Sequence, residues 1–266
     1  MTRRALIGHT GFVGSNLCAA GGYTDSYNSS NFMEMAGQSF DEIVCSGIAA
    51  VKWFANKEPE QDWAHIQGLL DVLARARTRR FILISTIDVY PDPSQPFDED
   101  AVIEGLPNHA YGRHRLAVET WVRERFPDHL IVRLPALFGP GLKKNALYDL
   151  LNNNGVDKIN PASTFQWYPV FRLSSDIARA SSADLRLVNL FTEPLVTGDI
   201  VDALFPNAVV APSTQPAPAY NLNTKHGALF GGRNGYVMDA SQVMTALRTY
   251  VSTVRRTGIS ENQWSL

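Results

Sequence analysis

The chain has 266 residues, of which 45% are hydrophobic, so it can bury a core in one large domain or in a domain with a small appendage. Its 24 Lys and Arg residues nearly balance 26 Asp and Glu residues, and neither sign forms a long run. This balance argues against nucleic acid and anionic membranes as partners, because both attract clustered positive charge. We therefore expect a small-molecule partner.

The cysteines and the N-terminal residues bear on the compartment. The spacing of Cys18 and Cys45 matches neither a metal site nor a disulfide framework, so we expect two buried packing residues and no bound metal. Only three apolar residues, 5–7, precede Gly8, which is too few for a signal peptide. No apolar run approaches membrane-spanning length, so we expect a cytoplasmic protein without membrane contact.

In chain order, the first half alternates short apolar runs with amphipathic stretches, which is typical of helices that cross between parallel strands. We expect strands at residues 4–8, 22–27, 42–46, 80–85 and 129–133, and helices at residues 58–77 and 110–125. Past Gly139 we expect helices at residues 145–151, 174–184 and 240–254, and a strand at residues 185–190. These elements predict an α/β fold: a Rossmann-like doubly wound parallel sheet with a small C-terminal substrate-binding region.

A glycine-rich turn separates the first predicted strand from a helix. Gly8 permits a tight turn, Gly11 lets the backbone approach a pyrophosphate, and Gly14 lets the helix pack closely on the strand. We expect this turn to bind NAD or NADP through Gly8, Thr10, Gly11, Phe12, Val13 and Gly14. The cofactor-binding core is then residues 1–140, to which residues 173–192 return, and residues 141–172 and 193–266 form the substrate-binding region.

The end of the second predicted strand bears on the choice of cofactor. An acidic residue there usually binds the adenosine ribose of NAD, but this strand is followed by Asn28, Ser29 and Ser30. No carboxylate would repel a 2′-phosphate, and the serine hydroxyls can donate to one, which favours NADP(H). If Asp25 lies at the strand end, NAD is favoured instead.

Further motifs occur in a specific order along nearly the whole chain. After the glycine turn they are Val44-Cys45-Ser46-Gly47-Ile48-Ala49, Ile84-Ser85-Thr86-Ile87-Asp88-Val89-Tyr90, Tyr111-Gly112-Arg113-His114-Arg115-Leu116-Ala117-Val118-Glu119, Arg133-Leu134-Pro135-Ala136-Leu137-Phe138-Gly139-Pro140-Gly141 and Ser175-Asp176-Ile177-Ala178. Together they resemble the extended short-chain dehydrogenase/reductase family, the NAD(P)-dependent epimerases, dehydratases and reductases of nucleotide sugars. The first motif, from Gly8 to Ser15, is particularly similar to the branch that contains the GDP-fucose-type synthases.

The resemblance implies catalytic roles for Tyr111, Arg115 and Thr86. Tyr111 would exchange a proton with a substrate hydroxyl or carbonyl while hydride moves to or from the nicotinamide. Because the ordinary pKa of tyrosine is about 10, a cation one helical turn away, at position 115, is needed to favour the phenolate. Thr86 would hydrogen-bond to the same substrate oxygen, with Ser85 as the alternative. The resemblance also implies cofactor contacts from Tyr111, Arg115, Ser46, Gly47, Ile48, Leu134 and Pro135.

Two residues depart from the family pattern. Arg115 stands where the family has Lys, and its planar fork does not replace a slim ammonium although the charge is kept. His65 stands where the family often has Asn. Either Arg115 does the work of the lysine in a reshaped site, or the site has drifted and the protein is a catalytically weak or inactive NAD(P)-binding sensor or scaffold.

The residues after Thr86 bear on the reaction. Dehydratases of the family carry an acidic pair at this point, whereas this chain has Ile87 and Asp88, which disfavours 4,6-dehydration. We therefore expect an NAD(P)-dependent epimerase, reductase or dehydrogenase that acts on a nucleotide-linked or related sugar. The candidate substrate residues are Lys52, Asp88, Lys143, Lys144 and Trp167. A homodimer is a further expectation, because the helix at residues 110–125 carries enough apolar residues for the dimer packing of the family.

Overall fold

The computed structural model describes residues 2–210 and 215–257. The chain divides into two compact units, each assembled from separate stretches of sequence. The first unit comprises residues 1–91, 101–133 and 177–188, and the second comprises residues 92–100, 134–176 and 189–266. Residues 177–188 therefore return to the first unit after the chain has formed part of the second.

A six-stranded parallel sheet of the Rossmann type forms the centre of the first unit. In spatial order its strands are β2 (Asp25–Tyr27), β1 (Arg4–Ile7), β3 (Ser39–Cys45), β4 (Arg77–Thr86), β5 (His129–Leu134) and β9 (Leu187–Asn189). Ile7 of β1 lies between Tyr27 and Cys45 of the two neighbouring strands. Since β2 and β3 flank β1 on opposite sides, the turn after β1 lies at the topological switch point, where such sheets bind ligands.

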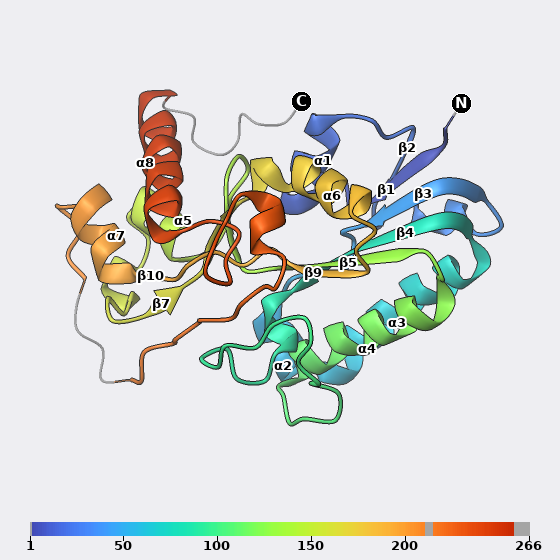
Figure 1. Cartoon of the computed structure of the whole chain (residues 1–266), viewed down its shortest axis with the longest axis horizontal. Helices are drawn as coiled ribbons and strands as arrows, with labels where there is room; N and C mark the ends of the chain where they lie inside the picture. Colours follow the sequence, from blue (N-terminus) through green and yellow to red (C-terminus); the bar gives the residue numbers. More distant parts are fainter. Residues whose placement is uncertain (1, 211–214, 258–266) are drawn as a thin grey trace. The chain divides into compact units, whose positions relative to one another are not determined.

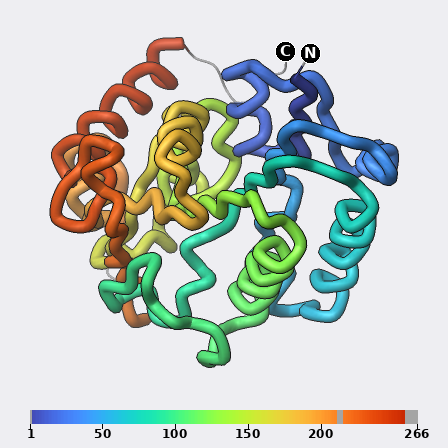
Figure 2. The backbone as a smooth tube through the Cα atoms, turned by 45° about the vertical axis from the view of Figure 1, so that its right-hand side comes forward, coloured from blue at the N-terminus to red at the C-terminus, as the bar shows by residue number. Residues whose placement is uncertain are grey.

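Helices cover both faces of this sheet. α1 (Phe12–Ala20) and α6 (Leu173–Ser182) lie on one face, and α3 (Pro59–Arg75) and α4 (Ala110–Arg125) lie on the other (Figure 1). α3 and α4 run side by side (Figures 1 and 2), and the short helix α2 (Lys52–Lys57) contacts both of them. The apolar stripes of α3 and α4 join the sheet in the main hydrophobic core. Two 3₁₀ turns, η1 (Phe32–Met35) and η2 (Ile87–Val89), follow β2 and β4.

The structure confirms the predicted fold class and corrects several details of the first unit. β2 begins at Asp25 and β3 at Ser39, rather than at residues 22 and 42. β4 begins at Arg77 rather than at residue 80, because the charged segment after α3 alternates in exposure as a strand does and pairs with β3 from Ser39 onward. Cys45 is buried as expected, but Cys18 is exposed. The reason is that α1 buries only Gly14 and Leu17.

The second unit consists of short elements. β6 (Ala136–Phe138) pairs with β8 (Trp167–Pro169), and β7 (Thr164–Phe165) pairs with β10 (Leu195–Val196). Its helices are α5 (Ala146–Asn152), α7 (Thr197–Leu204) and α8 (Ala240–Thr257), with 3₁₀ turns η3 (Val156–Lys158), η4 (Val170–Arg172) and η5 (Gly227–Phe230). The buried amide of Gln166 links three segments of the unit, because it donates to the carbonyls of Thr192 and Leu222 at 2.6 and 2.8 Å.

Two sequence-based expectations concern the chain as a whole. The assignment of residues 141–172 and 193–266 to substrate binding stays a prediction, and its residues 211–214 and 258–266 lie outside the described part of the chain. Among the residues that are described, no helix has the length and the apolar character needed to cross a membrane.

Candidate functional site

The turn between β1 and α1 is tight because glycines occupy its crowded positions. Gly8 has a φ of +85°, in the left-handed region, and a Cβ on it would lie 2.7 Å from the Cα of Gly47 and the carbonyl oxygen of Ser46. A Cβ on Gly14 would lie 2.0 Å from the carbonyl oxygen of Gly8. A larger residue at either position would displace backbone, so the turn packs directly against the loop after β3.

The N-terminus of α1 presents backbone N–H groups at this turn. Gly11 is the N-cap and carries no side chain over the helix end, and both Thr10 and Gly11 are exposed. The first N–H groups of a helix lack partners within it, and the helix dipole adds positive character there. Phe12 and Val13 supply the first of these groups. The arrangement fits a diphosphate, whose oxygens accept hydrogen bonds from such N–H groups.

The loop after β2 is polar and carries no carboxylate. Ser30 donates to the side-chain oxygen of Asn28 from its N–H at 2.8 Å and from its hydroxyl at 2.6 Å, and Ser29 is exposed. Asp25 lies at the other end of β2, the amino end, where its carboxylate pairs with Arg3 at 2.8 Å. The hydrogen bonds from Arg3 hold the pKa of Asp25 below its usual value. The carboxylate on which the NAD alternative depends is therefore not at the carboxyl end of the strand.

Two further groups of predicted cofactor residues follow strands of the same sheet. Ser46, Gly47 and Ile48 come directly after β3, and the Ser46 N–H and hydroxyl both donate to the Ile7 carbonyl, at 2.9 and 2.8 Å. This loop is therefore fixed beside the glycine turn. Leu134 is the last residue of β5, and Pro135 follows it.

Tyr111 lies in the first turn of α4, where several contacts fix the helix end. The Tyr111 N–H donates to the side-chain oxygen of Asn56 at 3.0 Å, and the Gly112 N–H donates to Nδ1 of the N-cap residue His109 at 3.0 Å. A Cβ on Gly112 would lie 2.3 Å from the carbonyl oxygen of Asp88. The glycine thus lets α4 approach the segment after β4 closely enough to place Tyr111 beside it.

Thr86 and Ser85 end β4, and their hydroxyls have different surroundings. The Ser85 hydroxyl donates to the buried carboxylate of Glu119 at 2.6 Å. The Thr86 hydroxyl accepts from the Asp88 N–H at 3.2 Å, and it is near enough to the Tyr111 hydroxyl to lower its pKa. Of the two alternatives, Thr86 is therefore the residue beside the tyrosine, and Ser85 is engaged elsewhere.

Arg115 lies one turn along α4 and covers the face of the Tyr111 ring. Its guanidinium carbon is 4.3 Å from the ring centroid, within the range of a cation–π contact. Its Nη1 donates to Asp62 of α3 at 3.0 Å, and its Nη2 donates to the carbonyl of Ala49. The side chain is 5% exposed, so this cation is held by fixed protein groups.

The protonation of Tyr111 follows from these surroundings. Burial raises the pKa of its hydroxyl, the Arg115 charge lowers it, the Asp88 charge raises it again, and the hydrogen bond with Thr86 lowers it. The net result is a pKa above the ordinary value, so the side chain is a neutral phenol at neutral pH.

Lys52 and Asp88 form an ion pair near the tyrosine. The Lys52 ammonium lies 2.7 Å from the Asp88 carboxylate, and Nε2 of His109 lies 3.9 Å from the same oxygen. Burial and the Lys52 charge lower the pKa of His109, whereas Asp88 raises it, and the net shift is downward. His109 is therefore neutral at pH 7, and the pair is the charged group on this side of Tyr111.

The remaining substrate candidates belong to the second unit. Lys143 and Lys144 are exposed in the turn before α5, which begins at Ala146 rather than at the lysines. Trp167 is 2% exposed and packs edge-on to Phe165, with ring centroids 6.1 Å apart. The Trp167 indole N–H has no hydrogen-bond partner among the described residues. Substrate roles for these three residues stay predictions.

Sequence reasoning missed Asp62, Asn56 and His109. Asp62 had the clearest signal, because it stands one turn before Ile66 in the apolar stripe of α3, where an unpaired carboxylate is costly. The sequence gave no signal for His109 and Asn56, because each of them accepts a hydrogen bond from a backbone N–H in the first turn of α4.

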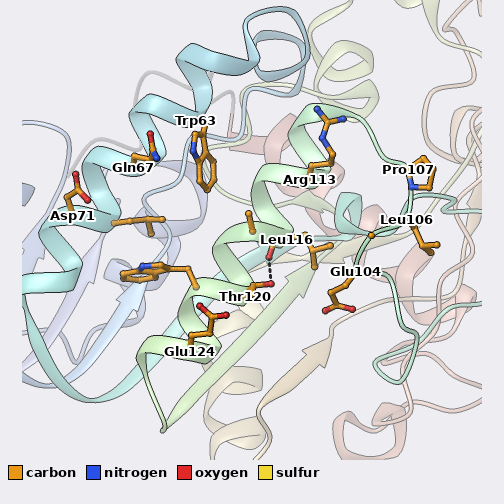
Figure 3. Close-up of a pocket in the computed structure, with 14 residues that line it drawn as sticks. Trp63, Gln67, Asp71, Glu104, Leu106, Pro107, Arg113, Leu116, Thr120 and Glu124 are labelled. Atoms are coloured by element: carbon orange, nitrogen blue, oxygen red, sulfur yellow. Dashed lines mark hydrogen bonds between the residues drawn. The ribbon is translucent and has the colours of Figure 1, made fainter.

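A separate groove of about 820 Å³ lies over α3 and α4 (Figure 3). Its floor is largely apolar, with Trp63 of α3 and Leu116 and Trp121 of α4, and the loop around Leu106 forms one side. None of the candidate catalytic residues lines this groove. It is therefore a feature of the outer surface of the helix pair.

Comparisons with known proteins bear on the family and the fold. The sequence model of the NAD dependent epimerase/dehydratase family matches residues 20–158. None of the curated proteins matches the chain significantly.

Among solved structures, dTDP-4-dehydrorhamnose reductase from Yersinia enterocolitica is similar, with a TM-score of 0.74 at 16% identity over 95% of this chain and 99% of that one. TunA, an NAD dependent NDP-hexosamine 5,6-dehydratase involved in tunicamycin biosynthesis, has a TM-score of 0.76 at 15% identity over 99% and 100%. RMD from Pseudomonas aeruginosa, complexed with NADPH, has a TM-score of 0.69 at 17% identity over 95% and 99%. At these identities the likeness concerns the fold.

Proposed function

The chain belongs to the NAD dependent epimerase/dehydratase family, and we propose that it uses Thr86, Tyr111 and Arg115 as an epimerase, reductase or dehydrogenase of a nucleotide-linked or related sugar. The observation that supports this proposal is that the Arg115 guanidinium lies over the Tyr111 ring at 4.3 Å and that Thr86 and Arg115 both lower the pKa of Tyr111. The substrate class follows from the family and from the nucleotide sugars named for the similar structures.

The cofactor would be held by the turn after β1 and by the loops after β2 and β3. A bound nicotinamide cofactor supplies or accepts hydride at the substrate carbon. The diphosphate would meet the α1 N-terminus, and the loop Asn28–Ser30 would meet the adenosine ribose. We propose a preference for NADP(H), because this loop has two hydroxyl donors and no carboxylate, while Asp25 is paired with Arg3 at the amino end of β2.

The protein's own groups account for the proton movement. When a carbonyl is reduced, Tyr111 gives its hydroxyl proton to the substrate oxygen, and Thr86 donates a hydrogen bond to that oxygen. In the reverse direction the phenolate of Tyr111 takes the proton from a substrate hydroxyl. Arg115 stabilises that phenolate through its charge, although burial works against it.

Asp88 narrows the reaction type. It is the one carboxylate in the two positions after Thr86, and it forms an ion pair with Lys52 at 2.7 Å. A single paired carboxylate does not supply both an acid and a base, so we place 4,6-dehydration below epimerisation, reduction and dehydrogenation.

Binding of NAD, NADH, NADP and NADPH, measured by calorimetry, is the first test. We expect the phosphorylated pair to bind more tightly than NAD and NADH. A chain that binds none of the four would not carry out the proposed chemistry.

Turnover with a panel of nucleotide sugars and their 4-keto forms is the second test. Tyr111→Phe should lower kcat by at least about a hundredfold, because general acid–base catalysis contributes 10² to 10⁴. Tyr23→Phe is the matched control, since Tyr23 contacts Arg4 outside the site. Full activity in Tyr111→Phe would remove the tyrosine from the reaction.

A binding protein without turnover is the second candidate function. The observation that favours it is that Arg115 already donates hydrogen bonds to Asp62 and to the Ala49 carbonyl. The guanidinium therefore has fewer donors left for a ribose hydroxyl of the cofactor. Tight cofactor binding without turnover on any substrate of the panel would support this candidate.

We also propose that two chains pair through the groove over α3 and α4. The residues of α4 that line the groove are spread about the middle of the helix. If two copies pair with their α4 helices antiparallel about a twofold axis, Arg113 therefore meets the partner copy's Glu124 and Leu116 meets its Trp121. Arg113 and Glu124 lie at opposite ends of the groove (Figure 3), which makes the pairing complementary in charge.

Light scattering after size exclusion tests this pairing. The protein should have the mass of a dimer, Arg113→Glu should shift it toward the monomer, and Arg113→Glu combined with Glu124→Arg should restore the dimer. A monomeric wild-type chain at micromolar concentration would exclude the interface.

A further inference from the structure

Asp62 lies beneath the proposed site and contacts the residue that departs from the family pattern. Its Oδ2 accepts from Nη1 of Arg115 at 3.0 Å, and its Oδ1 lies 3.4 Å from Nη2. The exposed fractions of the two side chains are 6% and 5%. Such a buried carboxylate and guanidinium hold each other, because either one alone would be left charged and without water.

We propose that Asp62 is a positioning residue that fixes the Arg115 guanidinium across the Tyr111 ring and balances its charge, so that Tyr111 serves as a proton donor to a substrate carbonyl. This inference rests on the proposed function and adds that the site favours reduction of a carbonyl over oxidation of an alcohol. Two further contacts hold the guanidinium: its Nη2 donates to the Ala49 carbonyl, and its carbon lies over the Tyr111 ring, 4.3 Å from the centroid.

Asp62 stays charged in this environment. Burial raises the pKa of its carboxyl, but hydrogen bonds from Arg115 and His114 lower it by more, so the net shift is downward. His114 contributes through its Nδ1, which lies 2.7 Å from Oδ2 of Asp62. The charged Asp62 carboxylate is therefore the counter-ion of the Arg115 guanidinium at neutral pH.

The opposite side of Tyr111 is balanced in the same way. The Lys52 ammonium is paired with the Asp88 carboxylate at 2.7 Å, and His109, with its lowered pKa, is neutral at pH 7. Arg115 and Lys52 thus each have a carboxylate partner. The Arg115 charge still lowers the pKa of Tyr111, but burial raises that pKa by more, so the hydroxyl keeps its proton at neutral pH.

The consequence for catalysis concerns the substrate's oxidation state. A ketone or aldehyde accepts hydride at its carbon from NAD(P)H and the Tyr111 proton at its oxygen, which leaves an alcohol, NAD(P)⁺ and a phenolate that takes a proton from water. The phenol is the form that this step needs. Oxidation of an alcohol needs the phenolate instead, so its rate should rise with pH through the raised pKa of Tyr111.

The test measures ionisation of Tyr111 without substrate or cofactor. Tyrosinate absorbance is recorded immediately after alkaline pH jumps, so that the fold is retained, and the Tyr111→Phe version of each protein is subtracted. Asp62→Asn should lower the Tyr111 midpoint by about one pH unit or more, because it leaves the Arg115 charge unbalanced. Asp71→Asn, the same change at an exposed position of α3, should leave the midpoint unchanged.

A double variant keeps the test decisive if Asp62→Asn does not fold. Asp62→Asn with Arg115→Gln removes both charges and leaves none buried, so its midpoint should stay within about half a unit of the wild-type value. An unchanged midpoint in Asp62→Asn, or a rise of one unit or more in the double variant, would overturn the inference. Absence of turnover in the wild type would instead refute the proposed function and leave this titration unaffected.

Discussion

Glu119 and Arg133 form a buried ion pair whose loss should be measurable as stability. Arg133 donates to the two carboxylate oxygens of Glu119 at 3.0 and 2.7 Å, and the side chains are 2% and 0% exposed. The Glu119 charge raises the pKa of Arg133 although burial lowers it, so the guanidinium stays charged. The third nitrogen of the Arg133 guanidinium, Nη1, donates to the Tyr90 hydroxyl at 2.8 Å. Replacing the carboxylate therefore leaves a buried cation without its counter-charge.

Glu119→Gln should destabilise the protein by about 3 to 5 kcal/mol, the usual cost of breaking a buried pair by removing one partner. This corresponds to a factor of roughly 150 to 5,000 in the unfolding equilibrium. In urea the midpoint of the first unit should fall by at least about 1 M, given a slope of about 1 to 3 kcal/mol per M. Far-ultraviolet circular dichroism, read at several wavelengths, follows the transition.

Two controls separate the buried pair from other effects. Glu104→Gln removes a carboxylate that pairs with Arg123 at 3.1 Å but is 52% exposed, so its cost should be about 0 to 1 kcal/mol. Glu119→Gln combined with Arg133→Met removes both buried charges and should recover much of the loss. Equal midpoints for Glu119→Gln and Glu104→Gln would refute the reasoning that burial makes the first pair matter.

Three further outcomes are expected from single substitutions. Gly14→Ala should weaken calorimetric NADPH binding at least tenfold, since its Cβ meets a backbone oxygen at 2.0 Å, whereas Gly68→Ala, with open space around it, should bind normally. Asn28→Asp should shift the preference from NADPH toward NADH, because a carboxylate repels a 2′-phosphate. A thiol reagent at pH 8 should label Cys18 within minutes and spare Cys45, whose pKa burial raises to about 11.

Local patterns were sufficient to predict most strands and the two long helices of the first unit, but not the short helix α2 or the starts of β2, β3 and β4. The helix predicted at residues 110–125 has the bounds of α4, because its apolar stripe is regular and Pro127 follows soon after its end. The glycine spacing predicted a turn that the structure builds with Gly8 at positive φ. In both cases the signal lies within a few residues of the element it specifies.

In the second unit the helices α5 and α8 lie close to the predicted ranges, residues 145–151 and 240–254, but the strands gave no comparable signal. β7 and β10 have two residues each, too few for an alternation of apolar and polar positions to appear. What orders this unit is instead a set of long-range side-chain contacts, such as those of Glu99 with the Asn189 N–H and the Thr224 hydroxyl at 2.7 and 2.6 Å. The partners are separated by 90 and 125 positions in the sequence, so local reasoning has no means of pairing them.

Local sequence reasoning has the same limit at Arg115, to which we assign a role beside Tyr111. The sequence identifies Arg115 as a departure from Lys, but the meaning of that departure depends on a carboxylate 53 positions earlier, on another helix. A lysine has one point charge, which does not reach Asp62 and the Ala49 carbonyl at once while covering the Tyr111 ring. A guanidinium does all three, because its donors lie in one plane with a flat face. Arg115 and Asp62 therefore form one structural unit, and the effect of Arg115→Lys should differ in the presence and absence of the Asp62 charge.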